Sequence, residues 1–506
     1  MLRLNRAMLP LVSLLACACL LHFFSLMRTP APAIDEAWNA NRAVAFLHTG
    51  RAFGSLDQGV FQKFDGYWTY FPWLAAFIHA GFVGLFGASL FSVRLASLFF
   101  GLLLLVAAYI IGRELGGKRT GLLAILVVAL SDAFVYSAHL ARHDIIVAAM
   151  GYGGIALYLT DKTPRSKLSF RSLLMGLQVG LTLDIHPNGM IYWAAIGALF
   201  LFDYGWSTFR SLRFWSFMLG IAGGVAFFVA MHILPYGATY SAIGRLGGVG
   251  SRTPPLLTGD PAILFDSFSY TLYQINLLVN VLVVAAFVLL LRRGKIGDKK
   301  LLVIYSVVLV AFAAIVRNKA FHYAIYISPA ASLLVAALLD QALGAIKGTT
   351  FVRKLSGTLA WAVAAAAFLF ALMPLQNQPM LDYDSTVQSL QKSIPPGKSV
   401  IGTQTYWFGL SDRPYYSWDQ AVYYQQYAPG STLDDAYRQL RPDYLILDSE
   451  LQTHFIDPGV ELPKYQWYLH LPRTQLTDFL NKRATLVSQT DSAIYGKVLV
   501  YKLNWN

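Results

Sequence analysis

The chain has 506 residues, of which 56% are hydrophobic and 13% are charged, and its mean hydropathy is +0.49. Soluble domains carry roughly 25% charged residues, so this composition excludes a soluble globular protein and indicates an integral membrane protein. The net charge of +13 does not indicate a nucleic-acid surface, because Lys and Arg lie mostly in short loops between apolar runs, where charge sets topology. The two cysteines, Cys17 and Cys19, lie within the first apolar run and provide no disulfide framework.

The first apolar run, residues 8–27, follows Arg3 and Arg6 and therefore resembles a secretory signal peptide. A signal peptide has an apolar region of only about 7–15 residues, so we interpret this longer run as an uncleaved membrane-spanning helix. Both interpretations place residue 31 onward outside the cytoplasm.

Segments that could span a membrane recur along the chain, since a spanning helix needs about 20 apolar residues. The sequence predicts eleven: 8–27, 88–111, 120–138, 144–160, 172–186, 189–205, 214–234, 270–291, 301–316, 323–343 and 356–374. With the N-terminus inside, nineteen Lys and Arg lie in short cytoplasmic segments, against ten in longer outer segments before residue 375. Cytoplasmic loops are enriched in these residues, so we predict a cytoplasmic N-terminus and an external C-terminus.

The composition changes at about residue 375, where the chain becomes polar. Strand-like runs, "SVIGTQTYW", "PDYLILD" and "KVLVYKL", alternate with helical segments at 431–440 and 474–483, a pattern typical of a small α/β domain. The predicted fold class is a polytopic α-helical membrane protein with about eleven spans, residues 1–374, followed by an extracytoplasmic α/β domain, residues 375–506.

The first outer loop, residues 28–87, is too long for a simple connector. Asp35 can N-cap a helix from Glu36 to about His48 that ends at Gly50. The aromatic stretch "YWTYFPWLAAFIHAGF" predicts a second segment at the membrane surface, because Trp and Tyr favour the headgroup level. Together the two segments would form a roof over the helices.

Unusual polar residues gather in the loops predicted to lie outside. They occur in "LARHDIIVA", in "LDIHPNG", in the Gly/Pro-rich segment 235–269, which could act as a lid, and in "VRNKAFHYAIYISP". Each has an ordinary structural explanation: Asp35 as an N-cap only, Arg142 and Asp144 as a loop ion pair, His186 as a helix-end residue, and Arg317 with Lys319 as anchors whose charges reach the headgroups. Charged groups near a membrane are costly, however, so their grouping on one side indicates a functional site.

These motifs carry a resemblance to a known family. The opening "IDEAWNANRAVAFLHTGR", then "LFGASLFSVRLASLFFG", "ARHD" and "HYAIYISPAASLLVAALL" resemble, in order and spacing over about residues 31–340, the bacterial GT-C glycosyltransferases. This superfamily includes the protein O-mannosyltransferases and the lipid A aminoarabinose transferase. The resemblance implies transfer of a sugar from a polyprenyl-phosphate donor to a glycan, lipid or protein acceptor on the outer face, with inversion at the anomeric carbon.

The resemblance also implies roles for individual residues. Asp35 matches the aspartate that acts as general base, Glu36 would support it, and Asp144 matches an acidic position that positions the acceptor. The leaving lipid phosphate needs cations already in place, for which the candidates are Arg317, Lys319, Arg142 and Lys63. The remaining pocket candidates are His186, His322, Tyr323, Tyr70 and Arg245.

The sequence departs from its relatives at one point and leaves two questions open. The aminoarabinose transferase has Lys-Pro-Pro where this chain has "YWTYFPW", so the lysine that contacts donor phosphate is missing, and Lys63 is the candidate substitute. A divalent cation (Mg, Mn or Zn) remains open, with candidate ligands Glu36, Asp144, His143, His186 and His322. The alternative functions are a transporter or flippase of a lipid-linked sugar and a non-catalytic membrane scaffold.

Overall fold

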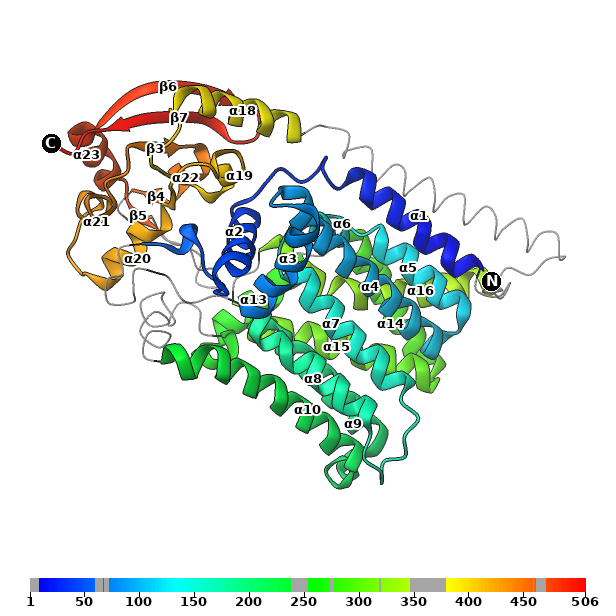
Figure 1. Cartoon of the computed structure of the whole chain (residues 1–506). Coiled ribbons are helices and arrows are strands. Elements are labelled where there is room, and N and C mark those ends of the chain that lie inside the picture. Colours follow the sequence, from blue (N-terminus) through cyan, green and yellow to red (C-terminus); the bar gives the residue numbers. More distant parts are fainter. Residues whose placement is uncertain are drawn as a thin grey trace. The chain divides into compact units, whose positions relative to one another are not determined.

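The computed structural model describes residues 9–59, 67, 72–237, 254–273, 277–317, 320–345, 379–457, 459–460 and 470–506. The chain divides into two compact units built from non-contiguous segments (Figure 1). The first unit comprises Met1–Leu26, Ser97–Val229 and Pro254–Asn377, and the second comprises Met27–Ala96, Ala230–Thr253 and Gln378–Asn506. The second unit thus groups the first loop with the C-terminal segment, whereas the predicted division at residue 375 separates them.

Helices occupy each of the first ten predicted spans, and the eleventh, 356–374, lies outside the described residues. These helices are α1 (Leu9–Ser25), α4 (Leu90–Gly116), α5 (Lys118–Ala129), α6 (Asp132–His139), α7 (Asp144–Thr160), α8 (Phe170–Ile185), α9 (Met190–Tyr204), α10 (Leu212–Phe228), α14 (Leu277–Arg293), α15 (Ile296–Ile315) and α16 (Ser328–Ala345). An additional helix, α13 (Pro261–Tyr273), precedes α14. The predicted helical membrane-protein fold is therefore confirmed.

Fewer helices than predicted are long enough to cross a membrane alone. Within the described ranges, three helices qualify by length and composition: Leu90–Gly116, Leu212–Gly237 and Ser328–Ala345. Two bent pairs, Lys118–Ala129 with Asp132–His139 and Pro261–Leu272 with Leu277–Arg293, raise the number to five if each pair forms one span. Helices such as α1 and α7 are apolar but shorter than about 20 residues.

Glycines allow α8 and α10 to pack closely. Gly176 and Gly180 on α8 face Gly220 and Gly224 on α10, and a Cβ at Gly220 would collide with the backbone carbonyl of Leu173. Small residues four apart on both helices are the usual means by which membrane helices bring their backbones together. This contact holds α8 in place within the first unit.

The first loop of the second unit contains two helices. Helix α2 (Ile34–Thr49) ends at Gly50, whose φ of 70° is the left-handed conformation that favours glycine at a helix end. Helix α3 (Trp73–Phe86) begins after Pro72. The predicted helices of this loop are therefore present, although their position at a membrane surface stays a prediction. A short 3-10 turn, η2 (Ser55–Asp57), follows α2.

The C-terminal segment forms a five-stranded sheet with the order β2-β1-β3-β7-β6. The strands are β1 (Val400–Gly402), β2 (Tyr415–Ser417), β3 (Tyr444–Leu447), β6 (Ala484–Ser492) and β7 (Gly496–Leu503). The first three are parallel, whereas β7 pairs antiparallel with both β3 and β6. A separate two-stranded sheet joins β4 (Phe455–Ile456) to β5 (Leu471–Pro472).

Helices pack around this sheet: α18 (Pro379–Ser393), α19 (Trp407–Leu410), α20 (Asp419–Tyr427), α21 (Leu433–Leu440), α22 (Ser449–Thr453) and α23 (Arg473–Arg483). The buried side chains of Trp418, Tyr437 and Phe479 lie in the core between them and the sheet. The three predicted strands correspond to β1, β3 and β7, and the two predicted helices to α21 and α23, which confirms the α/β class. The sequence interpretation missed β2, β6 and α18.

The C-terminal segment contacts the first loop directly within the second unit. The Gln420 side-chain amide donates a 3.1 Å hydrogen bond to the Leu56 carbonyl, and the Tyr495 hydroxyl donates a 3.0 Å bond to the Pro32 carbonyl. Tyr495 and Gln420 are both buried. The start of α2 and the turn that follows it are therefore fixed from the C-terminal side.

Candidate functional site

The acidic pair of the first loop lies in the first turn of α2. The prediction that Asp35 is the N-cap is wrong, because Ala33 occupies the N-cap and Asp35 is the second residue of the helix. Glu36 does the capping instead: its Oε2 accepts a 3.1 Å hydrogen bond from the Ala33 N–H. Asp35 is half-buried, and its carboxylate lies where the helix dipole favours negative charge.

Glu36 forms a fully buried ion pair with Arg94, which lies on the first turns of α4. The guanidinium donates from Nε to Oε1 and from Nη2 to Oε2, each at 2.8 Å, and Nη2 also donates to the Pro30 carbonyl at 2.9 Å. Both side chains are 0% exposed. Two parallel charge-assisted bonds compensate for the loss of water around both groups, so Glu36 fixes α2 against α4.

A second buried ion pair holds the turn that follows α2 in the same loop. Asp57 accepts from Arg42 Nε and Nη2 at 2.7–3.2 Å, from the Trp38 indole N–H at 2.5 Å and from the Gly54 N–H at 3.1 Å. Trp38 and Arg42 are four residues apart on α2 and therefore lie on one face. Asp57 thus ties turn η2 to this helix.

A separate polar cluster lies in the first unit at the start of α7. The Arg142 Nε donates to Asp144 Oδ2 at 2.8 Å, and the Tyr326 hydroxyl donates to Asp144 Oδ1 at 2.9 Å. Asp144 is 0% and Arg142 is 7% exposed. The loop ion pair that the sequence left open is therefore present, and it is buried.

His322 continues this cluster from the 3-10 helix η8 (Phe321–Tyr326). Arg142 Nη2 lies 2.9 Å from His322 Nε2. Burial, together with the neighbouring Arg142 charge, lowers the pKa of His322 to about 3, so the imidazole is neutral at physiological pH. Because a guanidinium can only donate, Nε2 accepts and we assign the ring proton to Nδ1.

Aromatic and imidazole rings extend the cluster. The His143 and His186 rings stack with centroids 5.2 Å apart, Tyr323 lies 5.6 Å from His186, and His322 lies 4.3 Å from Tyr323. His186 ends α8, as one sequence alternative proposed, and its Nδ1 accepts a 3.2 Å bond from the Asn188 N–H. The Asn188 side-chain nitrogen is buried and has no hydrogen-bond partner within the described parts of the chain. It can therefore donate to a ligand.

The structure therefore collects six sequence-predicted residues in one cluster, namely Arg142, His143, Asp144, His186, His322 and Tyr323. Asp35 and Glu36 lie in the second unit, and Arg317, half-buried, follows α15. Four candidates lie outside the described residues: Lys63, Tyr70, Arg245 and Lys319. Most of the predicted lid lies outside as well, since residues 238–253 are not described.

The candidate metal ligands that the structure describes do not gather into a metal site. Among the side chains that the structure describes, no group of three or more His, Cys, Asp or Glu is arranged to hold a metal ion. Both oxygens of Glu36 are engaged by Arg94. The described residues of the proposed ligand set thus do not fit a metal site.

The sequence interpretation missed Arg94, Arg42, Asp57 and Tyr326. Arg94 could have been identified from "FSVRLASLFF", because one arginine inside an apolar run requires a buried partner. The sequence alone does not indicate that this partner is Glu36, which is 58 residues away. Asp57 and Tyr326 give no signal in the sequence that distinguishes them from neighbouring loop residues.

The chain has an ArnT-like GT-C fold, made of the helical unit, the first loop with its two helices and the small α/β segment. ArnT from Cupriavidus metallidurans in the apo state matches with a TM-score of 0.64 at 15% sequence identity, over 98% of this chain and 98% of that chain. ArnT bound to undecaprenyl phosphate matches with a TM-score of 0.61 at 13% identity, over 97% of each chain.

Two further comparisons agree with this fold. Residues 71–234 match the sequence profile of the dolichyl-phosphate-mannose-protein mannosyltransferase family. The archaeal oligosaccharyltransferase AglB from Archaeoglobus fulgidus, in complex with an inhibitory peptide and a dolichol-phosphate, matches with a TM-score of 0.52 at 14% identity, over 87% of this chain and 69% of that chain. No curated protein sequence matches the chain. The chain thus resembles ArnT and the protein mannosyltransferases, as its motifs predict.

Proposed function

We propose that the protein is a membrane glycosyltransferase that moves a sugar from a polyprenyl-phosphate donor to an acceptor on the outer face of the membrane, with inversion. The likeness to ArnT with undecaprenyl phosphate bound, which extends over 97% of both chains, carries this proposal. The acceptor is a glycan, a lipid or a protein hydroxyl. The mannosyltransferase profile over residues 71–234 supports the same reaction class.

Asp35 is the general base of the proposed reaction. The acceptor hydroxyl loses its proton to the carboxylate as its oxygen forms the new bond to the anomeric carbon, and the bond from that carbon to the phosphate oxygen breaks. The half-buried position of Asp35 in the first turn of α2 keeps the carboxylate accessible. Glu36 supports this geometry by holding α2 through Arg94.

The leaving group is polyprenyl phosphate, whose growing negative charge requires cations or hydrogen-bond donors already in position. Arg142 is fixed by Asp144 and His322, and we assign phosphate binding to it together with Arg317 and Lys319. Asp144 orients Arg142 by this contact. The neighbouring rings of His186 and Tyr323, with the Asn188 side-chain nitrogen, would contact the sugar.

The experiment is the release of polyprenyl phosphate from a polyprenyl-phosphate sugar by the purified protein. The Asp35→Asn variant should lose at least 100-fold in rate, the lower limit of about 10²–10⁴ for a general base. Asp132→Asn is the matched control, since Asp132 is also an acid in the first turn of a helix but is exposed. Full activity of Asp35→Asn would remove Asp35 from the mechanism.

Separate outcomes distinguish the other functions. Movement of the lipid-linked sugar across liposomes without cleavage would identify a flippase. If the protein neither cleaves the lipid-linked sugar nor moves it across the membrane, the non-catalytic scaffold is the function that remains. Unchanged donor affinity in both Arg317→Ala and Lys319→Ala would remove these two residues from the phosphate site while leaving the transferase proposal intact.

A further inference from the structure

An apolar groove of about 410 Å³ runs between α4, α7 and α8 in the first unit. Its lining is apolar except for Thr160 and Gln178, and the Gln178 side-chain nitrogen donates to the Met150 carbonyl at 2.7 Å. Leu103 and Val106 are 43% and 36% exposed, so the groove opens on the outer surface of the helices. In a membrane protein this surface faces lipid chains rather than water.

One end of the groove is basic. Thr160 lines the groove, and its carbonyl accepts a 3.2 Å bond from Arg171 Nη1. Lys162, whose side chain is 78% exposed, donates to the Leu159 carbonyl at 3.2 Å and lies 3.7 Å from Glu114. Arg113 follows the lining residue Ile110 by three positions on α4 and so lies on the same side of that helix. Three cations with one carboxylate thus surround this end.

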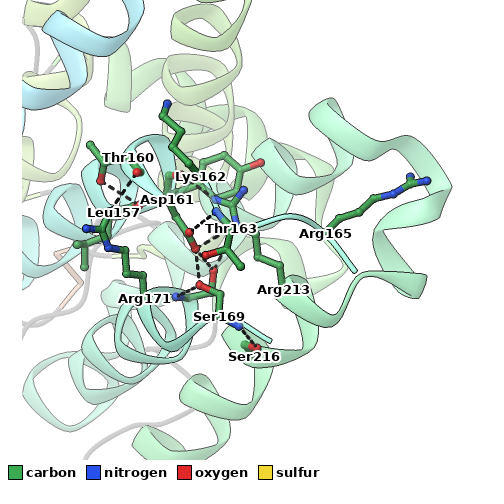
Figure 2. A network of polar contacts seen from close by, with 12 residues as sticks. Leu157, Thr160, Asp161, Lys162, Thr163, Arg165, Ser169, Arg171, Arg213 and Ser216 are labelled. Atoms are coloured by element: carbon green, nitrogen blue, oxygen red, sulfur yellow. Dashed lines mark hydrogen bonds and ion pairs between the residues drawn. The ribbon is translucent and has the colours of Figure 1, made fainter. Parts of the chain in front are cut away.

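A buried network fixes the loop that carries Lys162 (Figure 2). Asp161 accepts from the Ser169 hydroxyl at 2.6 Å and the Thr163 N–H at 2.9 Å, and Arg213 Nε lies 3.2 Å from its Oδ2. Asp161 is 4% exposed. The backbone of the loop after α7 is therefore fixed beside the groove.

The length of the groove matches one leaflet of a bilayer. Its lining on α7 runs from Ala149 to Thr160, a span of eleven residue-to-residue steps, which at about 1.5 Å each is about 16 Å. The hydrocarbon core of a bilayer is about 30 Å thick, so one leaflet is about 15 Å. A groove of this length with its basic end at the level of the headgroups fits one acyl chain and the phosphate above it.

We propose that this groove binds an anionic phospholipid of the leaflet at the Lys162 end, which the Lys and Arg distribution predicts to be the cytoplasmic one. One acyl chain lies along α7 against the apolar lining, and the phosphate contacts Lys162 and Arg171. The site is independent of the proposed glycosyl transfer, because its residues belong to neither the Arg142 cluster nor α2.

The test measures binding of phosphatidylglycerol and of phosphatidylcholine to the purified full-length protein by native mass spectrometry. The wild type should prefer phosphatidylglycerol, and Lys162→Gln with Arg171→Gln together should reduce its affinity about 30-fold, at about 1 kcal/mol for each basic residue near an anionic surface. The affinity for phosphatidylcholine should change little. Equal binding of the two lipids by the wild type would overturn the proposal.

A matched control uses another cation of the same loop. Arg165 is exposed, donates to the Ser207 hydroxyl at 2.8 Å and points away from Lys162 in Figure 2. Arg165→Gln should leave phosphatidylglycerol affinity within about threefold of the wild type, since a basic residue next to the lipid is worth about fivefold and Arg165 points away from the site. A loss equal to that of the double variant would show general charge attraction and overturn the site.

The groove itself is tested with Gly153→Leu. A Cβ at Gly153 meets only the side-chain end of Gln178, which can rotate, so the variant should fold while its side chain fills the groove. Both phospholipids should then bind more weakly. Unchanged phosphatidylglycerol binding by Gly153→Leu would show that no phospholipid chain lies in the groove. The same conclusion would follow if the variant lost affinity only for polyprenyl phosphate, measured in the same way.

Discussion

Arg94→Met should loosen the first turn of α2 more than any exposed charge substitution does. The variant leaves Glu36 as a fully buried carboxylate with neither of its 2.8 Å partners. Removing one member of a buried ion pair costs about 3–5 kcal/mol. At 1.36 kcal/mol for each factor of ten, the opening equilibrium of this segment should rise by about 150-fold to 5,000-fold.

Amide hydrogen exchange measures this directly, because local opening sets the exchange rate of protected amides. The amides of α2 should exchange faster by this factor in Arg94→Met, whereas those of α8 should not change. Glu36→Gln combined with Arg94→Met should restore most of the protection, since no buried charge remains without a partner.

The matched control is Arg113→Met, which breaks an exposed ion pair between Arg113 and Glu114. Exposed pairs contribute about 0–1 kcal/mol, so exchange near Arg113 should change by less than about fivefold. An effect of Arg94→Met no larger than this control would refute the assignment of the Glu36 pair as the contact that fixes α2.

Four further changes test other parts of the structure. Asp144→Asn should weaken donor binding, measured by titration with polyprenyl phosphate, because Arg142 loses its ionised partner. Asn188→Ala should weaken binding of the sugar donor while thermal stability stays near the wild type, since its side-chain nitrogen has no partner within the described residues. Gly220→Leu should lower the thermal midpoint strongly, because α8 and α10 cannot approach. Burial raises the pKa of Asp419 from 3.8 to about 7. The contribution of this carboxyl group to stability is therefore present below pH 4 and is lost as the pH rises through 7. Asp419→Asn should thus stabilise the C-terminal segment in thermal unfolding at pH 8 but not at pH 4.

The elements that the sequence predicts are those with strong local patterns. The apolar runs of the helices, the β-branched and aromatic runs of β3 and β7, and the glycine that ends α2 at Gly50 each fix a conformation through neighbouring residues. Strand β2, Tyr415–Ser417, has three residues and depends on pairing with β1, so its local pattern is too short to detect. The span count differs for a similar reason: hydropathy reports apolar length, whereas the bend between α5 and α6, of 65°, depends on packing.

In the candidate site, too, the local features were predictable from the sequence and the long-range contacts were not. "ARHD", "LDIHPNG" and "FHYAIY" each mark a polar loop, and the structure brings these three loops together around Asp144 and Arg142. Contacts between residues far apart in the chain cannot be predicted from local patterns, since nothing local links Arg142 to His322, which is 180 residues away. The error at Asp35 has the same origin: Ala33 is the N-cap because Glu36 supplies the capping oxygen from inside the helix.

The adjacent acids Asp35 and Glu36 lie in different surroundings because of helix geometry. Successive residues of an α-helix project about 100° apart, since 3.6 residues make a turn. Glu36 projects into the buried side of α2, where Arg94 engages both its oxygens, and Asp35 must therefore project elsewhere and remains half-buried. The buried acid sets the rotation of the helix about its own axis, and this rotation decides where the second carboxylate points. The proposed base thus depends on an ion pair that takes no part in the proton transfer.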